Sequence, residues 1–210
     1  MHAGSPVAPQ LGTTREHTPA PKRETITAIK TGLGRRPLVI VGMMGAGKSS
    51  IGRRLAHTLS MGFVDSDDEI EKAANLTIPE IFERHGEAHF RDGEHRVIAR
   101  LVSEGEQVVA LGGGAFERAP TRKLVANQAI SMWLNADLET LMNRVRRKSH
   151  RPLLQTADPE GTMKRLLDER TPNYKTADLV VHSSNEPHGQ IVARCIERLA
   201  DYLSSNGTNS

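Results

Sequence analysis

The sequence is poor in several kinds of residue, and each scarcity narrows what the chain can be. It has one cysteine, Cys195, so no disulfide can form within the chain and nothing indicates an oxidising compartment. No apolar run approaches the roughly 20 residues of a membrane-spanning helix, and the N-terminus lacks the apolar segment of a secretory signal. Only 3% of the residues are aromatic, so the core must be built from aliphatic side chains. We therefore expect a cytoplasmic protein with no membrane partner.

Net positive charge is also absent outside the N-terminal region. The formal net charge of the chain is +3. Residues 1–36 hold six Lys or Arg and two Glu, a net of +4, which leaves −1 for residues 37–210. A nearly neutral remainder has no broad basic face for a phosphate backbone. The sequence therefore predicts no nucleic-acid partner.

Composition divides the chain into one domain and two tails. Residues 1–36 contain four prolines and no sustained apolar period, which is typical of a disordered N-terminal extension. A transit peptide would be richer in serine and poorer in acidic residues. Residues 204–210 are small and polar, which predicts a disordered C-terminal tail. The domain itself is expected over residues 37–203.

Apolar runs and helical patterns alternate through this domain. The runs that predict strands lie at 38–41, 62–64, 108–111, 130–134 and 179–181. The patterns that predict helices lie near 48–60, 78–103, 118–127, 137–147, 160–170 and 189–203. Such alternation predicts an α/β fold with a parallel sheet covered by helices on both faces. Ligands of such sheets bind beyond the carboxyl ends of the strands.

Residues 42–49 carry the most informative motif. They fit G-x-x-x-x-G-K-[ST] at every fixed position, between a predicted strand and a predicted helix. Backbone N–H groups and the helix N-terminus would surround a polyphosphate, Lys48 would reach the outer phosphates, and Ser49 would offer its hydroxyl to Mg²⁺. The residues expected to contact the nucleotide here are Gly45, Ala46, Gly47, Lys48, Ser49 and Ser50. The motif predicts binding of a nucleoside triphosphate.

Acidic residues follow the second predicted strand. Asp65 and Asp67 are two positions apart, so an extended backbone would direct both carboxylates to one face. One can hold the Mg²⁺ shell through water, and the other can accept a hydroxyl proton. The alternative is an acidic cap and first turn of a helix, which suits Asp68 and Glu69. We favour a functional role for Asp65 and Asp67.

Three glycines, Gly112, Gly113 and Gly114, follow the third predicted strand. Many P-loop proteins place a metal-holding aspartate at this strand end. Backbone without side chains instead lets a small substrate approach N–H groups closely. The magnesium carboxylate must then come from elsewhere, and Asp65 is the available candidate.

Two basic features suggest recognition of anions. Arg91 and Glu94 lie at i and i+3 of a predicted helix, so Glu94 can orient the guanidinium. Residues 144–154 form a basic stretch that ends in a helix breaker. That stretch is either a solvated surface or a mobile lid that brings an arginine to the phosphates, a contribution that can reach about 10³–10⁵ in rate.

Histidines also occur at a helical spacing that zinc can use. His85 and His89 are at i and i+4, with His95 further along. The sequence does not fit H-E-x-x-H, because the glutamate is in a different position. We therefore interpret these residues as solvated histidines on a helix face rather than as metal ligands.

Taken together, these motifs resemble the shikimate kinase family, and the resemblance spans residues 37–203. The matching positions are 42–49, Asp65 and Asp67, Phe90 and Arg91, 111–114, 151–154, and Arg170 within 169–174. The resemblance implies a P-loop NTPase-like three-layer sandwich with a five-stranded parallel sheet in the order 2-3-1-4-5. It also implies MgATP-dependent phosphorylation of the shikimate 3-hydroxyl, a step toward chorismate and the aromatic amino acids.

The resemblance also implies roles on the acceptor side. Asp67 would bind the shikimate hydroxyls and assist removal of the proton from the attacking one. Arg91 and Arg170 would clamp the shikimate carboxylate, because planar guanidinium groups hold a carboxylate at two points. The residues implied to line the ring are Gly112, Gly113 and Gly114, with a backbone contact from Gly113.

On the nucleotide side, the implied roles concern phosphate, metal and adenine. Lys48 and Arg151 would stabilise the transferring phosphoryl group. Ser49 would ligate Mg²⁺ directly and Asp65 through water, while Arg144 would lie against the adenine. The chain departs from many relatives after the last predicted strand, where residues 182–187 contain no arginine. That departure leaves the adenine contacts there unassigned.

Two other functions remain open from sequence. The first is a related small-molecule kinase, such as a gluconate or nucleoside kinase, but a neutral acceptor would leave Arg91 and Arg170 without a carboxylate. The second is a regulatory nucleotide-binding protein without catalysis, but such a protein needs neither an acceptor base such as Asp67 nor a lid arginine such as Arg151. By analogy with enzymes of this size we expect a monomer.

Overall fold

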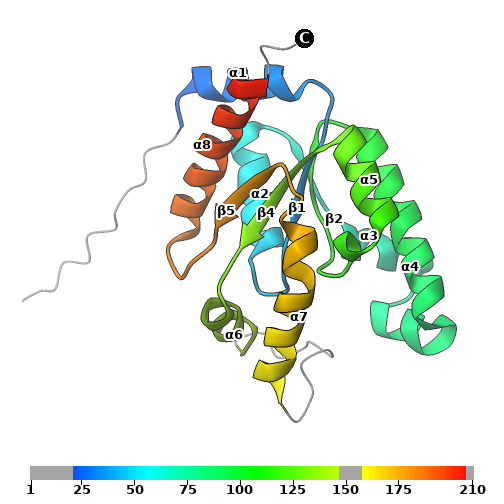
Figure 1. Ribbon diagram of the computed structural model, residues 1–210. Helices are drawn as coiled ribbons and strands as arrows, with labels where there is room; N and C mark the ends of the chain where they lie inside the picture. Colours follow the sequence, from blue (N-terminus) through cyan, green and yellow to red (C-terminus); the bar gives the residue numbers. More distant parts are fainter. Residues whose placement is uncertain (1–20, 147–157, 207–210) are drawn as a thin grey trace, which may run out of the picture.

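The computed structural model describes residues 21–146 and 158–206. Its centre is one five-stranded sheet, parallel throughout, in the order β2-β3-β1-β4-β5 (Figure 1). The strands are β1 (Leu38–Val41), β2 (Gly62–Asp65), β3 (Gln107–Ala110), β4 (Ile130–Asn135) and β5 (Leu179–His182). The predicted strand positions and strand order are confirmed.

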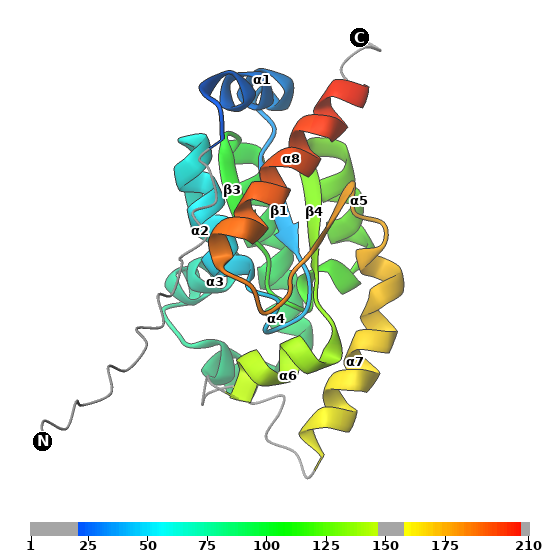
Figure 2. The ribbon, with the colours of Figure 1, turned by 90° about the vertical axis from the view of Figure 1, so that its left-hand side faces the viewer.

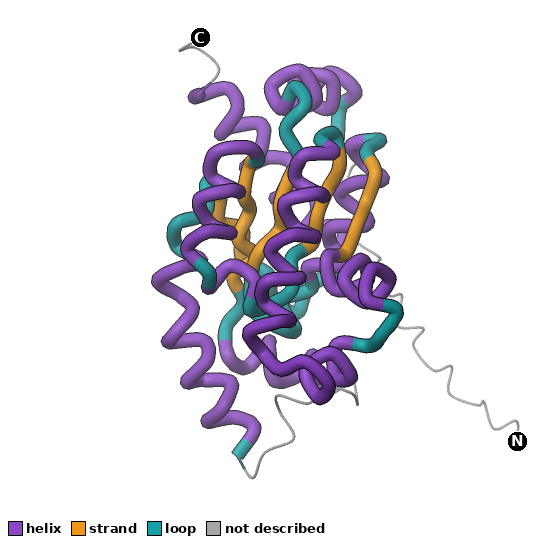
Figure 3. Tube along the Cα trace, turned by 90° about the vertical axis from the view of Figure 1, so that its right-hand side faces the viewer, coloured by secondary structure: helices purple, strands orange, loops and turns teal. Residues whose placement is uncertain are grey.

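Helices cover both faces of this sheet. They are α1 (Arg23–Leu33), α2 (Lys48–Leu59), α3 (Ser66–Ala74), α4 (Ile78–Glu104), α5 (Ala119–Gln128), α6 (Leu138–Arg146), α7 (Pro159–Tyr174) and α8 (His188–Asn206), with a 3₁₀ turn η1 (Ala115–Glu117). Helices α2 and α8 lie on one face (Figure 2), and α4, α5 and α7 lie on the other (Figure 3). Central strand β1 is buried on both faces, which explains its unbroken apolar sequence.

One prediction about domain limits is wrong. Residues 1–36 were expected to be disordered, yet residues 23–33 form α1. Ile29 and Leu33 are buried there at 1% and 2% exposure, and Gly32 packs closely against Leu203 of α8. The apolar positions 26, 29 and 33 recur at helical spacing, and α8 provides the surface that buries them. Residues 1–20 lie outside the described residues.

The C-terminal limit also differs from the prediction. Helix α8 continues to Asn206, three residues into the tail expected from residue 204. Leu203 is buried at 8% exposure against the body of the protein, which holds this last turn. Residues 207–210 lie outside the described residues. Within those residues, no helix combines the length and apolarity needed to span a membrane.

Helix α4 changes direction at Gly86, whose backbone is non-helical with φ of 76°. The rings of His85 and His89 face each other across this kink, with centroids 4.8 Å apart. His95 lies elsewhere, with Nδ1 3.1 Å from the Thr121 hydroxyl. Within the described residues, no three His, Cys, Asp or Glu side chains gather in a way that could hold a metal.

Candidate active site

The sequence motifs meet at one end of the sheet. The loop that leads from β1 into α2 and the glycine turn that follows β3 both lie beyond the carboxyl ends of the strands (Figure 1). Helix α1 lies at the opposite end of the sheet. The site is therefore remote from α1 and from the C-terminal end of α8.

The phosphate loop has the backbone that its glycines allow. Gly45 and Gly47 have φ of 84° and 97°, in the left-handed region that favours glycine. A side chain at Gly45 would also meet Val145 Cγ2 at 2.9 Å. Lys48 Nζ donates to the carbonyl oxygens of Gly42 (2.8 Å) and Met43 (3.1 Å), so its ammonium group lies over the loop. The N-terminus of α2 adds partial positive charge at the same place.

The two oxygen groups expected to hold magnesium lie side by side. Ser49 Oγ donates to Asp65 Oδ2 at 2.6 Å. A hydroxyl and a carboxylate next to a phosphate loop form the hard-oxygen donor set that suits Mg²⁺, which keeps several waters and phosphate oxygens as further ligands. The residues present therefore fit the expected ion.

The expected backbone between the two aspartates is wrong. Asp65 ends β2 and caps α3, where its Oδ1 accepts from the Asp67 N–H at 3.1 Å. Asp67 lies in the first turn of α3 rather than on an extended segment. Asp65 thus provides the helix cap that the sequence left open as an alternative for this acidic segment, and it also bonds Ser49.

A cavity of about 590 Å³ opens beside the phosphate loop. Its lining residues are Gly45, Gly47, Lys48, Ser49, Ser50, Arg144, Val145, Asn185, Glu186 and His188. Arg144 is fixed at this cavity, because Nη1 donates to Ala46 O (3.0 Å) and Ser183 Oγ (2.8 Å) while Nη2 donates to Ser184 O. The guanidinium expected to lie against the adenine therefore borders the nucleotide cavity.

Sequence reasoning did not assign four residues of this cavity, Val145, Asn185, Glu186 and His188. Glu186 is engaged by Arg194 in an ion pair. His188 begins α8, and burial together with the charges of Arg54 and Arg144 lowers its pKa, so the imidazole is neutral at neutral pH. Only the departure of residues 182–187 from the family pattern pointed to this segment.

Each glycine of the turn after β3 adjoins a different functional group. A Cβ atom at Gly112 would collide with the Asp67 carboxylate, and one at Gly114 would lie 3.0 Å from Arg91 Nη1 and Nη2. A Cβ atom at Gly113 would lie 3.7 Å from Arg170 Nη1 and 3.4 Å from the Met44 N of the phosphate loop. The absence of side chains thus brings the acceptor residues and the phosphate loop together.

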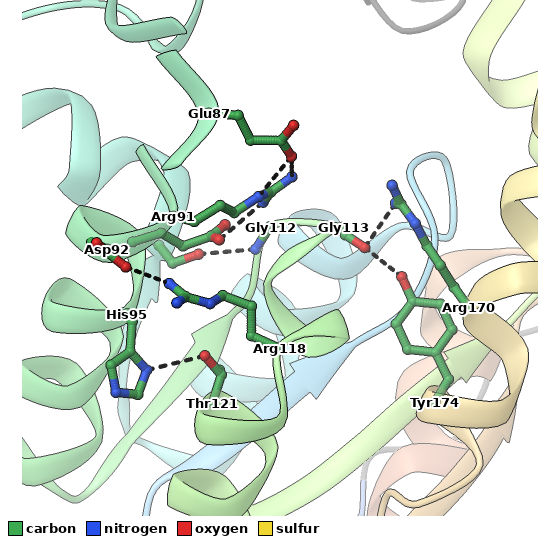
Figure 4. Close-up of polar contacts among 12 residues, drawn as sticks. Glu87, Arg91, Asp92, His95, Gly112, Gly113, Arg118, Thr121, Arg170 and Tyr174 are labelled. Atoms are coloured by element: carbon green, nitrogen blue, oxygen red, sulfur yellow. Dashed lines mark hydrogen bonds and ion pairs between the residues drawn. The ribbon is translucent and has the colours of Figure 1, made fainter. Parts of the chain in front are cut away.

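Arg91 is oriented by acidic neighbours, as its spacing predicts. Its Nη1 contacts Glu94 Oε2 at 2.9 Å, and its Nε contacts Glu87 Oε1 at 3.3 Å (Figure 4). The Glu94 side chain is 3% exposed. Burial raises the pKa of Glu94, while the charge of Arg91 opposes that shift. The guanidinium is therefore held in place from behind by a buried carboxylate.

Arg170 has a different environment. Its Nη1 donates to the Gly113 carbonyl at 3.0 Å, and within the described parts of the chain it forms no ion pair. Figure 4 shows Arg91 and Arg170 on opposite sides of the glycine turn. Arg170 thus offers a charge that a substrate anion can neutralise.

A second cavity, of about 510 Å³, lies between these arginines. Its lining residues are Glu87, Ala88, Arg91, Asp92, Gly114, Glu117, Arg118, Leu166, Glu169 and Arg170. Arg118, which sequence reasoning missed, pairs with Asp92 at 3.0 Å at its edge. No sequence pattern marks this pair, because 26 positions separate the two residues. Acidic and basic side chains both line this cavity, and Arg91 and Arg170 are the groups that can bind a small anion.

Comparison with known proteins identifies the family. A sequence model of the shikimate kinase family matches residues 44–200. The chain belongs to the shikimate kinase family. The shikimate kinase of Bradyrhizobium diazoefficiens is 61% identical over 175 residues, which are 83% of this chain and 84% of that protein. A solved shikimate kinase from Acinetobacter baumannii, in complex with shikimate, has a TM-score of 0.76 and 37% identity over 85% of this chain and 98% of its own.

Membership in the shikimate kinase family makes the chain an ATP-dependent phosphotransferase, as the sequence predicts. The P-loop NTPase-like sandwich expected from the resemblance is confirmed. A gluconokinase from Sinorhizobium meliloti also superposes, with a TM-score of 0.58 and 17% identity over 84% of this chain and 98% of its own. That identity shows a shared fold alone, so the acceptor residues have to distinguish the two activities. Arg151 lies outside the described residues.

Proposed function

We propose that the chain transfers the γ-phosphoryl group of ATP to the 3-hydroxyl of shikimate. The observation that carries this proposal is the position of Gly113 between the phosphate loop and Arg170. One cavity adjoins the phosphate loop, and the other lies between Arg91 and Arg170. Gly113 touches both sides, since a Cβ atom there would lie 3.8 Å from the Gly42 carbonyl and 3.7 Å from Arg170 Nη1. A phosphate donor and an anionic acceptor can therefore be held next to each other.

Binding at the acceptor cavity provides most of the orientation. Arg91, held by Glu94, and Arg170, without an ion pair among the described residues, would grip the shikimate carboxylate from two sides. Within the described residues, the N–H groups of Gly113 and Gly114 have no acceptor and are available to a substrate oxygen. Fixing the ring in this way places one hydroxyl near Asp67, and such positioning can supply a large part of the rate.

Asp67 would serve as the proton acceptor. Its carboxylate adjoins Gly112, the first glycine after β3, and Asp67 lies two positions after Asp65 in the chain. In this role it orients the attacking hydroxyl and takes its proton as the oxygen–phosphorus bond forms. General base catalysis of this kind contributes typically about 10²–10⁴ in rate.

Charge on the transferring group would be neutralised from the loop side. Lys48 and the N–H groups of the α2 N-terminus bind the phosphate oxygens, and Ser49 and Asp65 would hold Mg²⁺. When bound, the ion supplies positive charge to the phosphate oxygens. Arg144 would flank the adenine, and Arg151 stays a proposed lid arginine. Mg²⁺ dependence, a monomeric state and a cytoplasmic location stay predictions.

A coupled ADP-release assay tests this function. Purified protein and MgATP are combined with shikimate, quinate, gluconate or a nucleoside, and phosphorylated products are identified. We expect ADP release that depends on shikimate and a product phosphorylated at the 3-hydroxyl. Preference for another acceptor would reassign Arg91 and Arg170. Tight ATP binding without turnover on any acceptor would favour a regulatory protein.

A further inference from the structure

The Gly113 carbonyl receives two hydrogen bonds from the last turn of α7. Tyr174 Oη donates at 2.5 Å and Arg170 Nη1 donates at 3.0 Å (Figure 4). The arginine has an assigned task in the proposed function, whereas the tyrosine hydroxyl has none. Both donors converge on the glycine of this turn that adjoins the phosphate loop as well as Arg170.

Tyr174 is built to donate this hydrogen bond permanently. The residue is 1% exposed, and its ring stacks on Phe116 and Trp133 with centroids 6.4 Å and 5.9 Å away. Burial raises the pKa of the phenol well above its usual range, so the hydroxyl keeps its proton at any working pH. The sulfur of Met43 lies 3.9 Å from Oη and is a weaker acceptor than the carbonyl.

The hydrogen bond from Tyr174 fixes the direction of a peptide. In a trans peptide the C=O and the following N–H point in opposite directions. Because the Gly113 carbonyl is held toward α7, the Gly114 N–H points away from α7. Gly114 lines the acceptor cavity, and its N–H meets no acceptor within residues 21–146 and 158–206. The tyrosine thereby orients a free donor at the acceptor site.

The same bond affects Arg170. If the guanidinium turns from the Gly113 carbonyl to a substrate carboxylate, the part-buried carbonyl loses a donor, and an unsatisfied buried acceptor is unfavourable. With Tyr174 in place, the carbonyl keeps one hydrogen bond throughout. Arg170 can then bind the substrate without that penalty.

We propose that Tyr174 is a positioning residue of the acceptor site, whose hydroxyl holds the Gly113 carbonyl and so leaves Arg170 able to bind the carboxylate of the acceptor. This proposal rests on the proposed function. It concerns binding of the acceptor and not of the nucleotide, because the groups through which the hydroxyl acts, Arg170 and Gly114, line the acceptor cavity and not the nucleotide cavity. The effect of losing the hydroxyl is therefore selective for one substrate.

The test is Tyr174→Phe, which keeps the stacked ring and removes only the hydroxyl. We expect the KM for shikimate to rise roughly tenfold, equivalent to about 1.4 kcal/mol, while the KM for ATP and kcat at saturating shikimate change less than about twofold. The matched control is Tyr202→Phe, which removes the only other tyrosine hydroxyl, bonded to Asp178 far from the site. The control should leave both KM values unchanged.

A double-mutant cycle separates positioning from general loosening of the fold. Placed in an Arg170→Ala background, Tyr174→Phe should raise the KM for shikimate by clearly less than tenfold, since no guanidinium remains to be released and only the orientation of the Gly114 N–H is still affected. A tenfold rise that persists in that background would overturn the proposal, as would equal rises in both KM values or an unchanged KM for shikimate in the single variant. Wild-type protein without shikimate-dependent ADP release would instead overturn the proposed function itself.

Discussion

The nucleotide side and the acceptor side of the site are built in different ways. The phosphate-binding part of the nucleotide side is one continuous segment, residues 42–50, which runs from β1 into α2, and the rest of that cavity is lined from the segments 144–145 and 185–188. The acceptor side is assembled from α3, α4, the turn after β3 and α7, so that Asp67 and Arg170 are 103 positions apart. A contiguous phosphate site can be recognised by its own sequence, whereas a dispersed acceptor site depends on the fold to bring its residues together.

This comparison predicts that substitutions of acceptor-side residues change kcat or the KM for shikimate without changing the affinity for ATP. The largest effect is expected for Asp67→Asn, which preserves shape and removes the proton acceptor. We expect kcat to fall by about 10²–10⁴ with nearly unchanged ATP affinity, measured by steady-state kinetics and by calorimetry with ATP. Asp68→Asn, at the exposed neighbouring position, is the control and should keep full activity. An unchanged kcat in Asp67→Asn would remove the residue from its role.

A second prediction concerns a part of the molecule that belongs to neither side. Leu33→Ala in α1 deletes buried apolar atoms and should lower the free energy of unfolding by about 2–4 kcal/mol. Both KM values should stay the same at a temperature where the variant is folded, because α1 lies at the far end of the sheet. Urea unfolding and kinetics measure the two quantities, with exposed Thr27→Ala as the control. A variant as stable as the wild type would show that α1 does not pack as described.

A smaller effect is expected for a substitution that keeps the positive charge at position 91 but removes the planar guanidinium group. Arg91→Lys should raise the KM for shikimate by about tenfold, because a point charge cannot reproduce the planar fork of a guanidinium. The KM for ATP should not change. Arg100→Lys is the matched control, since Arg100 lies on the same helix and pairs with Glu69 and Glu104 away from the cavity. Equal KM values for shikimate in wild type and Arg91→Lys would remove Arg91 from the carboxylate clamp.

The smallest effect concerns the carboxylate behind Arg91. Burial raises the pKa of Glu94, so the folded state keeps its proton to higher pH than the unfolded state. Stability therefore falls as pH rises from the ordinary glutamate range through the raised pKa, and levels off above it. Glu94→Gln lacks this titrating group. The free energy of unfolding of this variant, measured by urea unfolding, should therefore fall less over the same pH range.

Glu94→Gln should also raise the KM for shikimate a few-fold, because the amide orients Arg91 less firmly than the carboxylate does. Glu87→Gln, whose side chain is 69% exposed, is the control and should keep the pH dependence of the wild type. Parallel stability curves for wild type and Glu94→Gln would contradict the assigned effect of burial.

Much of the fold could be predicted from sequence, for reasons that particular elements make clear. The four-residue run at β1 is apolar throughout because both faces of a central parallel strand are covered, and the same signal located the other strands. The extension before β1 was misjudged, since Ile29 and Leu33 become a buried face only when α8 is present to cover them. Local composition contains no information about that distant partner.

The site shows the same limit. Residues of the phosphate loop were predicted from a motif, and Arg91 with Glu94 from their spacing on one helix. The helical position of Asp67 was not foreseen, because the cap that Asp65 provides competes with continued strand. The Arg118–Asp92 pair and the contact of Tyr174 with Gly113 depend on tertiary structure and leave no local pattern.

The central claim is that the acceptor side selects a carboxylate through Arg91 and Arg170. The most direct measurement compares kcat/KM of the wild-type protein for shikimate and for its neutral carboxamide, with ATP saturating. We predict a loss of at least about a hundredfold for the carboxamide, because charge-assisted bidentate hydrogen bonds are replaced by weaker neutral ones. Equal kcat/KM values for the two acceptors would contradict the account.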